Sequence, residues 1–145
     1  MFTKACEYGI RACVLVALHS MNGKRISLKE IAKEIDSPLP FTAKILQKLV
    51  KNELIYSIQG AQGGFEMATE NFKKITIEDI VIAIDGDAGF TMCVLGLKDC
   101  SEVNPCPAHK KYKHIKADFK EMIKSTNILE MVTDLKEGVA YLKID

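Results

Sequence analysis

The chain has 145 residues, of which 48% are hydrophobic and 27% are charged, a composition typical of one soluble globular domain, with or without a small appendage. This composition excludes an intrinsically disordered chain, and an odd number of cysteines (five) without a secretory context disfavours a disulfide-stabilised secreted protein. The net charge of +1 is unevenly distributed, because residues 1–75 carry a net +4 and residues 76–145 a net −3.

The first predicted element is a helix over residues 3–21, which Asn22-Gly23 ends. Its apolar run at residues 10–18 resembles the core of a signal peptide. However, Glu7 precedes the run, Arg11 interrupts it, and no cleavage site of small residues follows. We therefore expect a buried helix in a cytoplasmic protein that has no membrane partner.

Two further helices are predicted in quick succession. Ser27 and Glu30 have the spacing of a capping box, which begins a short second helix. Asp36-Ser37-Pro38 breaks the chain before a third helix, which runs to about Asn52. Two helices joined by such a short turn indicate a helix-turn-helix.

The third helix is amphipathic, with apolar residues on one face and basic or amide residues on the other. Lysine and glutamine on the outer face are suited to reading bases and contacting phosphates in a major groove. An ordinary solvated helix face is the alternative interpretation. The residues that we expect to contact DNA in and beside this helix are Ser37, Thr42, Lys44, Gln47, Lys48 and Lys51.

A β-hairpin is predicted directly after the helix-turn-helix. Its strands lie at residues 54–59 and 65–68, and residues 60–64 form a glycine-rich tip. A hairpin in this place is a wing, and we expect Gln59 and Gln62 on it to contact DNA. The glycines do not have the spacing of a phosphate-binding loop.

The second half of the chain is predicted to hold three helices. One begins at Thr76 and ends at Asp85-Gly86, a long one follows His109 to about Lys124, and a last one is capped by Ser125 or Thr126, with a strand or tail at residues 139–144. Apolar residues recur along the long helix at intervals of three, four and three, which is the pattern of a seam against a partner helix. The predicted homodimer interface consists of Tyr112, Ile115, Phe119 and Met122.

Three cysteines lie close together in the loop at residues 88–109. Cys93, Cys100 and Cys106 are separated by six and five residues, and prolines flank Cys106. An iron–sulfur cluster is the preferred interpretation, because its separate iron corners suit wide spacings between thiolates. Zinc bound by three cysteines and His109 is the second interpretation, and three unligated thiols are the third.

These parts in this order resemble the IscR/NsrR family of bacterial transcription regulators. The resemblance covers nearly the whole chain, and the residues that carry it are the segments at 26–32, 45–52, 60–65 and 75–80, Asp85-Gly86 and the three cysteines. It implies a dimer that reads a two-fold symmetric operator and binds an iron–sulfur cluster through Cys93, Cys100 and Cys106. It also implies that Glu7 is a possible fourth ligand, which would reach the cluster of the partner subunit. The other candidate is His109, which lies three residues after Cys106 in the sequence.

Two features depart from the family pattern. The gap of six residues between the first two cysteines leaves both a 2Fe-2S and a 4Fe-4S cluster open, and Gln59 stands where members often have arginine.

The predicted fold is mainly α with a small β-hairpin wing, a winged helix-turn-helix plus a long dimerisation helix. We assign residues 1–75 to DNA binding and residues 76–145 to the linking helix, the cluster loop and the dimerisation helix.

The predicted function is a DNA-binding transcription regulator, acting as a repressor, that senses iron–sulfur supply, nitric oxide or redox state. It is not an enzyme, since no nucleophile–base pattern or carboxylate pair is evident. The alternatives are a zinc-bound or thiol-oxidation-sensing regulator and a small iron–sulfur electron carrier. An electron carrier would leave the winged helix-turn-helix without a purpose.

Overall fold

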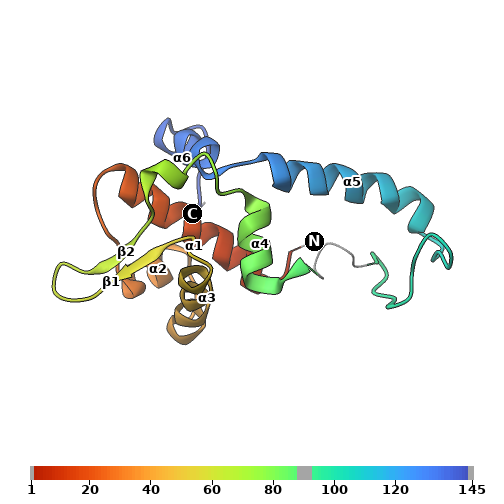
Figure 1. The fold of residues 1–145 in the computed structure, drawn as a ribbon, viewed down its shortest axis with the longest axis horizontal. Coiled ribbons are helices and arrows are strands. Elements are labelled where there is room, and N and C mark those ends of the chain that lie inside the picture. Colours follow the sequence, from red (N-terminus) through yellow and green to blue (C-terminus); the bar gives the residue numbers. More distant parts are fainter. Residues whose placement is uncertain (1, 88–92, 144–145) are drawn as a thin grey trace.

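The structure is a computed structural model that describes residues 2–87 and 93–143. It contains six α-helices, one 3-10 helix and one antiparallel hairpin in the described part. In chain order these are α1 (Lys4–Met21), α2 (Leu28–Glu34), α3 (Leu39–Lys51), β1 (Tyr56–Ile58), β2 (Gly64–Glu66), η1 (Thr69–Asn71), α4 (Ile77–Asp85), α5 (His109–Ser125) and α6 (Ile128–Lys136). Figure 1 shows the other helices gathered around α1, while α5 extends away from them.

Helix α1 is the centre of the core. Its middle is buried on all sides, from Ala12 to Ala17. Helices α3, α4 and α6 and strand β2 all pack against it. One continuous hydrophobic core therefore includes residues from both halves of the chain, such as Leu46 and Val132. No helix in the described ranges is long and apolar enough to cross a membrane.

The helix-turn-helix is present as predicted. The Ser27 hydroxyl accepts a hydrogen bond from the Glu30 N–H at 3.2 Å and so caps α2. The turn passes through Asp36, whose positive φ of 52° reverses the chain before α3. Helices α2 and α3 pack against each other, and Ile31, Ile35 and Leu49 are buried between them and the core.

The wing is a short hairpin with a third backbone segment at its base. Tyr56 pairs with Glu66 in the β1–β2 ladder, and Ile26 forms an isolated bridge with Phe65 on the other side of β2. Gly64 makes this approach possible. Its φ is +134°, and a Cβ atom there would lie 2.9 Å from the Ile26 carbonyl oxygen, so only glycine fits.

Helix α4 joins the helix-turn-helix and the wing to the cysteine loop. It begins after Thr76, as predicted, and Thr76 and Asp79 form a capping box there. The helix approaches α1 closely at Gly9, where a Cβ atom would lie 3.0 Å from Cγ1 of Ile84. At its end, the Asp85 carboxylate accepts hydrogen bonds from the Thr3 hydroxyl (2.7 Å) and the buried Cys6 thiol (2.9 Å).

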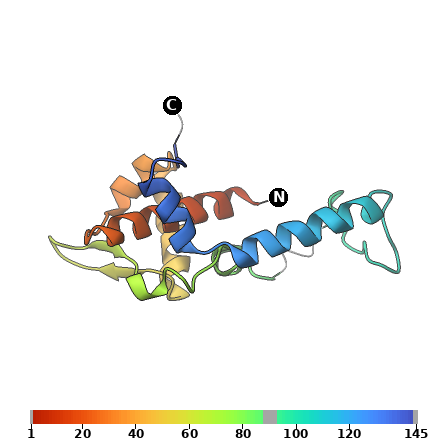
Figure 2. The same cartoon turned by 90° about the horizontal axis from the view of Figure 1, so that it is seen from above.

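Helix α5 leaves the body and carries the cysteine loop at its far end, as Figure 2 shows from above. Seventeen residues give it a length of about 25 Å. Ile123 is its one fully buried residue. The cysteine loop is therefore built outside the main hydrophobic core.

Two expectations for the C-terminal part were wrong or incomplete. Helix α6 is capped by Asn127, whose side chain forms a reciprocal box with Glu130, and not by Ser125 or Thr126. Both predicted caps instead bond backward to Met122, as expected for hydroxyls at a helix end. Residues 139–143 form no strand, and Ile144, the last residue of the predicted strand or tail, lies outside the described residues.

Candidate metal centre and DNA-contacting surface

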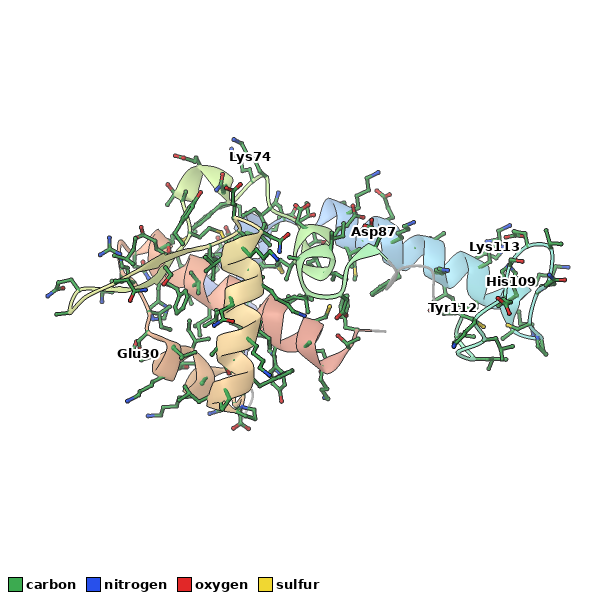
Figure 3. The ribbon with its side chains drawn as sticks, turned by 60° about the horizontal axis from the view of Figure 1, so that its bottom comes forward. Glu30, Lys74, Asp87, His109, Tyr112 and Lys113 are labelled. Carbon is green, nitrogen blue, oxygen red and sulfur yellow. The ribbon has the colours of Figure 1, made fainter. Side chains whose placement is uncertain are left out.

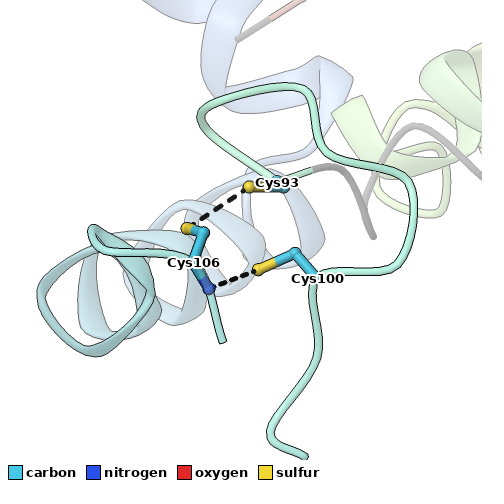
Figure 4. Close-up of side chains that lie close together, drawn as sticks. All are labelled: Cys93, Cys100 and Cys106. Carbon is cyan, nitrogen blue, oxygen red and sulfur yellow. Dashed lines mark hydrogen bonds between the residues drawn. The ribbon is translucent and has the colours of Figure 1, made fainter. Parts of the chain in front are cut away.

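The structure brings the three loop cysteines together. All three Sγ atoms lie within 4.8 Å of one another, and those of Cys93 and Cys106 are 3.5 Å apart (Figure 4). Cys106 is buried, and Cys93 and Cys100 are half-buried. Residues 88–92, the start of the predicted loop, lie outside the described residues. In the described part, these are the cysteines that gather at one point, because Cys6 and Cys13 are buried separately in α1.

His109 completes a set of four donors. Its Nδ1 atom lies 3.3 Å from Sγ of Cys100, and its Nε2 atom lies 3.3 Å from a carboxylate oxygen of Glu102. Lys113 in turn contacts the same Glu102 oxygen at 2.8 Å. Figure 3 shows His109, Tyr112 and Lys113 together at the start of α5. A carboxylate behind the imidazole is the usual way in which a protein orients a metal-binding histidine.

Backbone amides favour the thiolate form of Cys93. The N–H groups of Leu97 and Leu95 lower the pKa of Cys93 to about 7, against the opposing effect of partial burial. At Cys100 the Cys106 N–H, which donates to its sulfur at 3.4 Å, also lowers the pKa, but burial and the neighbouring thiols outweigh it, and the net pKa is raised. Three thiolates this close repel one another, so a bound cation is needed to stabilise all of them.

The donor set fits a metal group. Two ligands on one tetrahedral metal with bonds of about 2.3 Å are about 3.8 Å apart. The pair Cys93 and Cys106, at 3.5 Å, and the pair Cys100 and His109, at 3.3 Å, are each close to this separation. Two such pairs match a binuclear cluster with two protein ligands on each metal. Because all three sulfurs lie within 4.8 Å of one another, the compact arrangement also fits a single zinc ion.

Glu7 lies apart from this site within one subunit. Its carboxylate forms an ion pair with Lys4 at 3.1 Å and does not line the cysteine pocket. Arg11, one turn after Glu7 on the same helix, lies over the Tyr8 ring at 4.8 Å from its centroid. A contact between Glu7 and the cluster of a second subunit remains a prediction.

The predicted DNA-binding face of α3 is only partly available. Lys44, Gln47, Lys48 and Lys51 are exposed. The prediction for Thr42 was wrong, because its side chain is fully buried and its hydroxyl lies 2.9 Å from Ser37 Oγ and 2.8 Å from the Pro38 carbonyl oxygen. The contact with Thr42 also occupies the hydroxyl of half-buried Ser37.

Lys48 has a second role that the sequence did not reveal. Its Nζ atom donates a hydrogen bond to the Ile84 carbonyl oxygen, at 3.1 Å, near the C-terminal end of α4. A lysine is favourable there because unpaired carbonyl groups at a helix end carry negative partial charge. Lys48 therefore links the predicted recognition helix to α4.

The wing presents both predicted glutamines. Gln59 and Gln62 are exposed. Sequence reasoning missed Arg25, which donates from Nε to Glu66 (2.9 Å) and from a terminal nitrogen to the Gln62 carbonyl (3.0 Å). Arg25 braces the wing against the segment before α2. Arg25 directly precedes Ile26, which pairs with Phe65 of β2. The sequence alone does not show this pairing, so the contact of Arg25 with the wing could not be predicted from it.

The four residues of the predicted dimer interface on α5 have different surroundings. Tyr112 lines the cysteine pocket, and the ring of Phe119 packs against Phe2 with centroids 5.1 Å apart. Ile115 and Met122 remain 56% and 46% exposed. Only these two of the four residues are fully available to a partner helix.

One known protein family matches nearly the whole chain. Residues 2–134 match the Rrf2 family, described as iron-dependent transcriptional regulators. The chain belongs to the Rrf2 family. This confirms the predicted resemblance, the winged-helix fold and the assignment as a transcriptional regulator and not an enzyme.

Individual relatives of this Rrf2 protein are also named as HTH-type transcriptional regulators. A protein of Aquifex aeolicus named for the class of HTH-type transcriptional regulators is 36% identical over 135 residues, which are 91% of each chain. The regulator IscR of Sodalis glossinidius is 25% identical over 132 residues, covering 91% of this chain and 78% of that protein. In the part of the chain that the structure describes, the three clustered cysteines are the group that could hold a metal ion or cluster.

Two solved structures have the same fold. T. potens IscR superposes with a TM-score of 0.72 at 25% identity, covering 97% of this chain and 92% of that one. CymR of B. subtilis, described as the global cysteine regulator, superposes with a TM-score of 0.71 at 22% identity, covering 92% of this chain and 96% of that one.

Proposed function

We propose that this transcription regulator is a repressor whose DNA binding depends on an iron–sulfur cluster held by Cys93, Cys100, Cys106 and His109. The observation that supports it best is the arrangement of the donors as two close pairs, at 3.5 Å and 3.3 Å. Two pairs favour a 2Fe-2S cluster over a 4Fe-4S cluster, in which each ligand binds a different iron and lies farther from the others. Such a cluster supplies a centre that iron–sulfur shortage, nitric oxide or oxidants can alter.

Zinc is the second candidate, because all three sulfurs lie within 4.8 Å of one another. Anaerobic purification followed by visible absorption, iron, acid-labile sulfide and zinc assays separates the two. We expect iron and sulfide in equal amounts, about two of each per chain. Stoichiometric zinc without sulfide would overturn the cluster and leave a zinc-bound or thiol-oxidation-sensing regulator.

The fourth ligand is His109 in this proposal, in preference to Glu7. His109 is already 3.3 Å from a cysteine sulfur and oriented by Glu102, whereas Glu7 would have to come from a second subunit. We expect His109→Ala to shift the visible absorption of the cluster and to weaken DNA binding. His114→Ala, an exposed histidine on the same helix, is the matched control. If Glu7→Ala moves both properties and His109→Ala moves neither, the ligand is Glu7.

The DNA-contacting residues in this proposal are Lys44, Gln47 and Lys51 on α3, with Gln59 and Gln62 on the wing, because all five are exposed. Lys44→Ala should weaken binding to all duplexes alike and reduce its salt dependence by about one unit of slope. Gln47→Ala should instead relax specificity at one base pair by about 1–3 kcal/mol. If neither change alters operator affinity at moderate salt, α3 is not the reading helix.

Lys48 supports a route by which the cluster loop can act on DNA binding. Helix α4 ends at Asp85 and leads toward the cysteines, and the Lys48 ammonium holds its last turn at Ile84. We expect Lys48→Met, which keeps an apolar stem and removes the donor, to reduce the difference in DNA affinity between cluster-loaded and cluster-free protein. Lys51→Met is the control, and an unchanged difference in Lys48→Met would exclude this route.

The proposed assembly is a cytoplasmic homodimer that binds a two-fold symmetric operator. Ile115 and Met122 supply exposed apolar area on one face of the projecting α5 helix, as a partner helix requires. Phe119 is a poorer test position because it also packs on Phe2. We expect Ile115→Asp to give monomers in sedimentation velocity, with Lys120→Asp as an exposed control on another face of α5. A dimer that survives Ile115→Asp places the interface elsewhere.

A further inference from the structure

The exposed start of α3 is apolar, although the rest of its outer face is basic. Leu39 is 41% exposed, Pro40 is exposed and Ala43 is half-buried. Residues 39, 40 and 43 lie on adjacent positions of one helix face. We refer to these three residues as the apolar tip.

Polar side chains near the apolar tip are already engaged or lie farther along the helix. The Thr42 hydroxyl is buried against Ser37 and the Pro38 carbonyl, and Pro38 caps the helix without a side-chain hydrogen bond. Lys44 is the next exposed polar residue along α3. The apolar tip itself therefore offers no side-chain donor or acceptor to a base edge.

The surroundings of the apolar tip favour a polyanion over an apolar protein partner. Lys44, Gln47 and Lys51 continue the same exposed surface, and no acidic residue occurs between Asp36 and Glu53. In a helix-turn-helix the N-terminal residues of the second helix contact base edges. The apolar tip would thus be placed against the floor of the major groove.

The apolar group that bases present in the major groove is the 5-methyl of thymine. We propose that the apolar tip reads thymine, with Leu39 contacting one thymine methyl in each half-site of the operator. This inference rests on the proposed DNA binding by α3 and adds the base that its first turn selects. Pro38 and Pro40 restrict the backbone around Leu39, so little conformational freedom is lost when the contact forms.

Substitution of deoxyuridine for thymine tests this contact, because it removes the methyl group and leaves the hydrogen-bonding edge intact. The probe is a duplex selected from a random pool by the cluster-loaded wild-type protein, with each thymine replaced in turn. We expect one position per half-site at which the dissociation constant rises about fourfold, and a rise of about 15-fold when both half-sites are changed.

Variants of Leu39 assign the effect to this residue. Leu39→Ala should bind the thymine and deoxyuridine duplexes equally at that position, whereas Leu39→Met, which keeps an apolar side chain, should retain most of the difference. Lys44→Ala should weaken binding to both duplexes by the same factor and so preserve their ratio. Circular dichroism verifies that each variant is folded.

Two outcomes would overturn the inference. Either no thymine shows a methyl dependence, or the dependence persists in Leu39→Ala, in which case the apolar tip faces something other than a base. Failure to select any duplex is a separate result, which would overturn the proposed DNA binding and the inference with it.

Discussion

Truncating Ile123 tests how α5 is attached to the rest of the protein. Ile123 is fully buried and is the single residue of α5 in that state, so it anchors the helix to the core. Ile123→Ala removes three carbon atoms from the side chain, a change that costs about 2–5 kcal/mol of unfolding free energy in protein cores. Ile123→Val removes one carbon and should cost about 0.5–1.5 kcal/mol.

These losses are measurable against the total stability. A chain of 145 residues is expected to unfold with roughly 7–20 kcal/mol. Urea denaturation followed by circular dichroism, at one fixed protein concentration, gives the free energy of each variant. Lys120→Ala, exposed on the same helix, should stay within about 0.5 kcal/mol of the wild type.

The metal content of Ile123→Ala gives a second, independent readout. His109 lies 14 residues before Ile123, which is about 20 Å along the helix. We therefore expect the purified variant to keep the proposed metal group despite its lower stability. Wild-type stability in Ile123→Ala, or loss of metal in proportion to the loss of stability, would refute the view that α5 has a core end and a separate metal end.

Three further predictions concern a cap, a buried thiol and the wing. Asn127→Ala removes the capping box of α6 and should lower stability by about 1 kcal/mol, seen as a fall of about 3–4 °C in the melting temperature; an unchanged melting temperature would contradict the cap. Burial raises the pKa of Cys13 from 9.0 to about 12. The folded state therefore holds its proton more tightly, and the stability present below pH 9 is lost as the pH rises toward 12. Cys13→Ala should reduce this alkaline loss in urea unfolding compared at about pH 8 and about pH 11, and an equal loss would exclude Cys13 as a source. Arg25→Ala should change stability by less than about 1 kcal/mol, because the ion pair of Arg25 with Glu66 is exposed. It should nevertheless speed hydrogen exchange at the amide of Gly63, because Arg25 also bonds to the Gln62 carbonyl; unchanged exchange would mean that Arg25 does not brace the wing.

Local signals in the sequence determined much of the fold. The Ser27 cap and the Thr76–Asp79 box marked two helix starts correctly because capping chemistry involves residues only three apart. The same rule was misapplied at α6, where Asn127 and Glu130 have the spacing of a box and take the place of Ser125 or Thr126. The buried position of Thr42 could also have been foreseen, since Ile45, Leu46 and Leu49 share its helix face.

Contacts between distant segments could not be predicted in this way. The bond from Lys48 to Ile84 and the packing of Phe2 on Phe119 join residues that no periodicity relates. The candidate metal site could be predicted only in part. The three cysteines were evident from composition, but their pairing, and the support of His109 by Glu102, depend on how the loop folds back on α5.

The position of the cysteine loop at the tip of a projecting helix has a consequence for how such regulators diverge. Doubling the length of a flexible loop costs only about 0.6 kcal/mol of closure entropy. The spacing between Cys93 and Cys106 can therefore change by insertion or deletion without disturbing the buried residues around α1. A lineage can thus acquire, exchange or lose the proposed metal group while the proposed DNA-contacting surface stays the same.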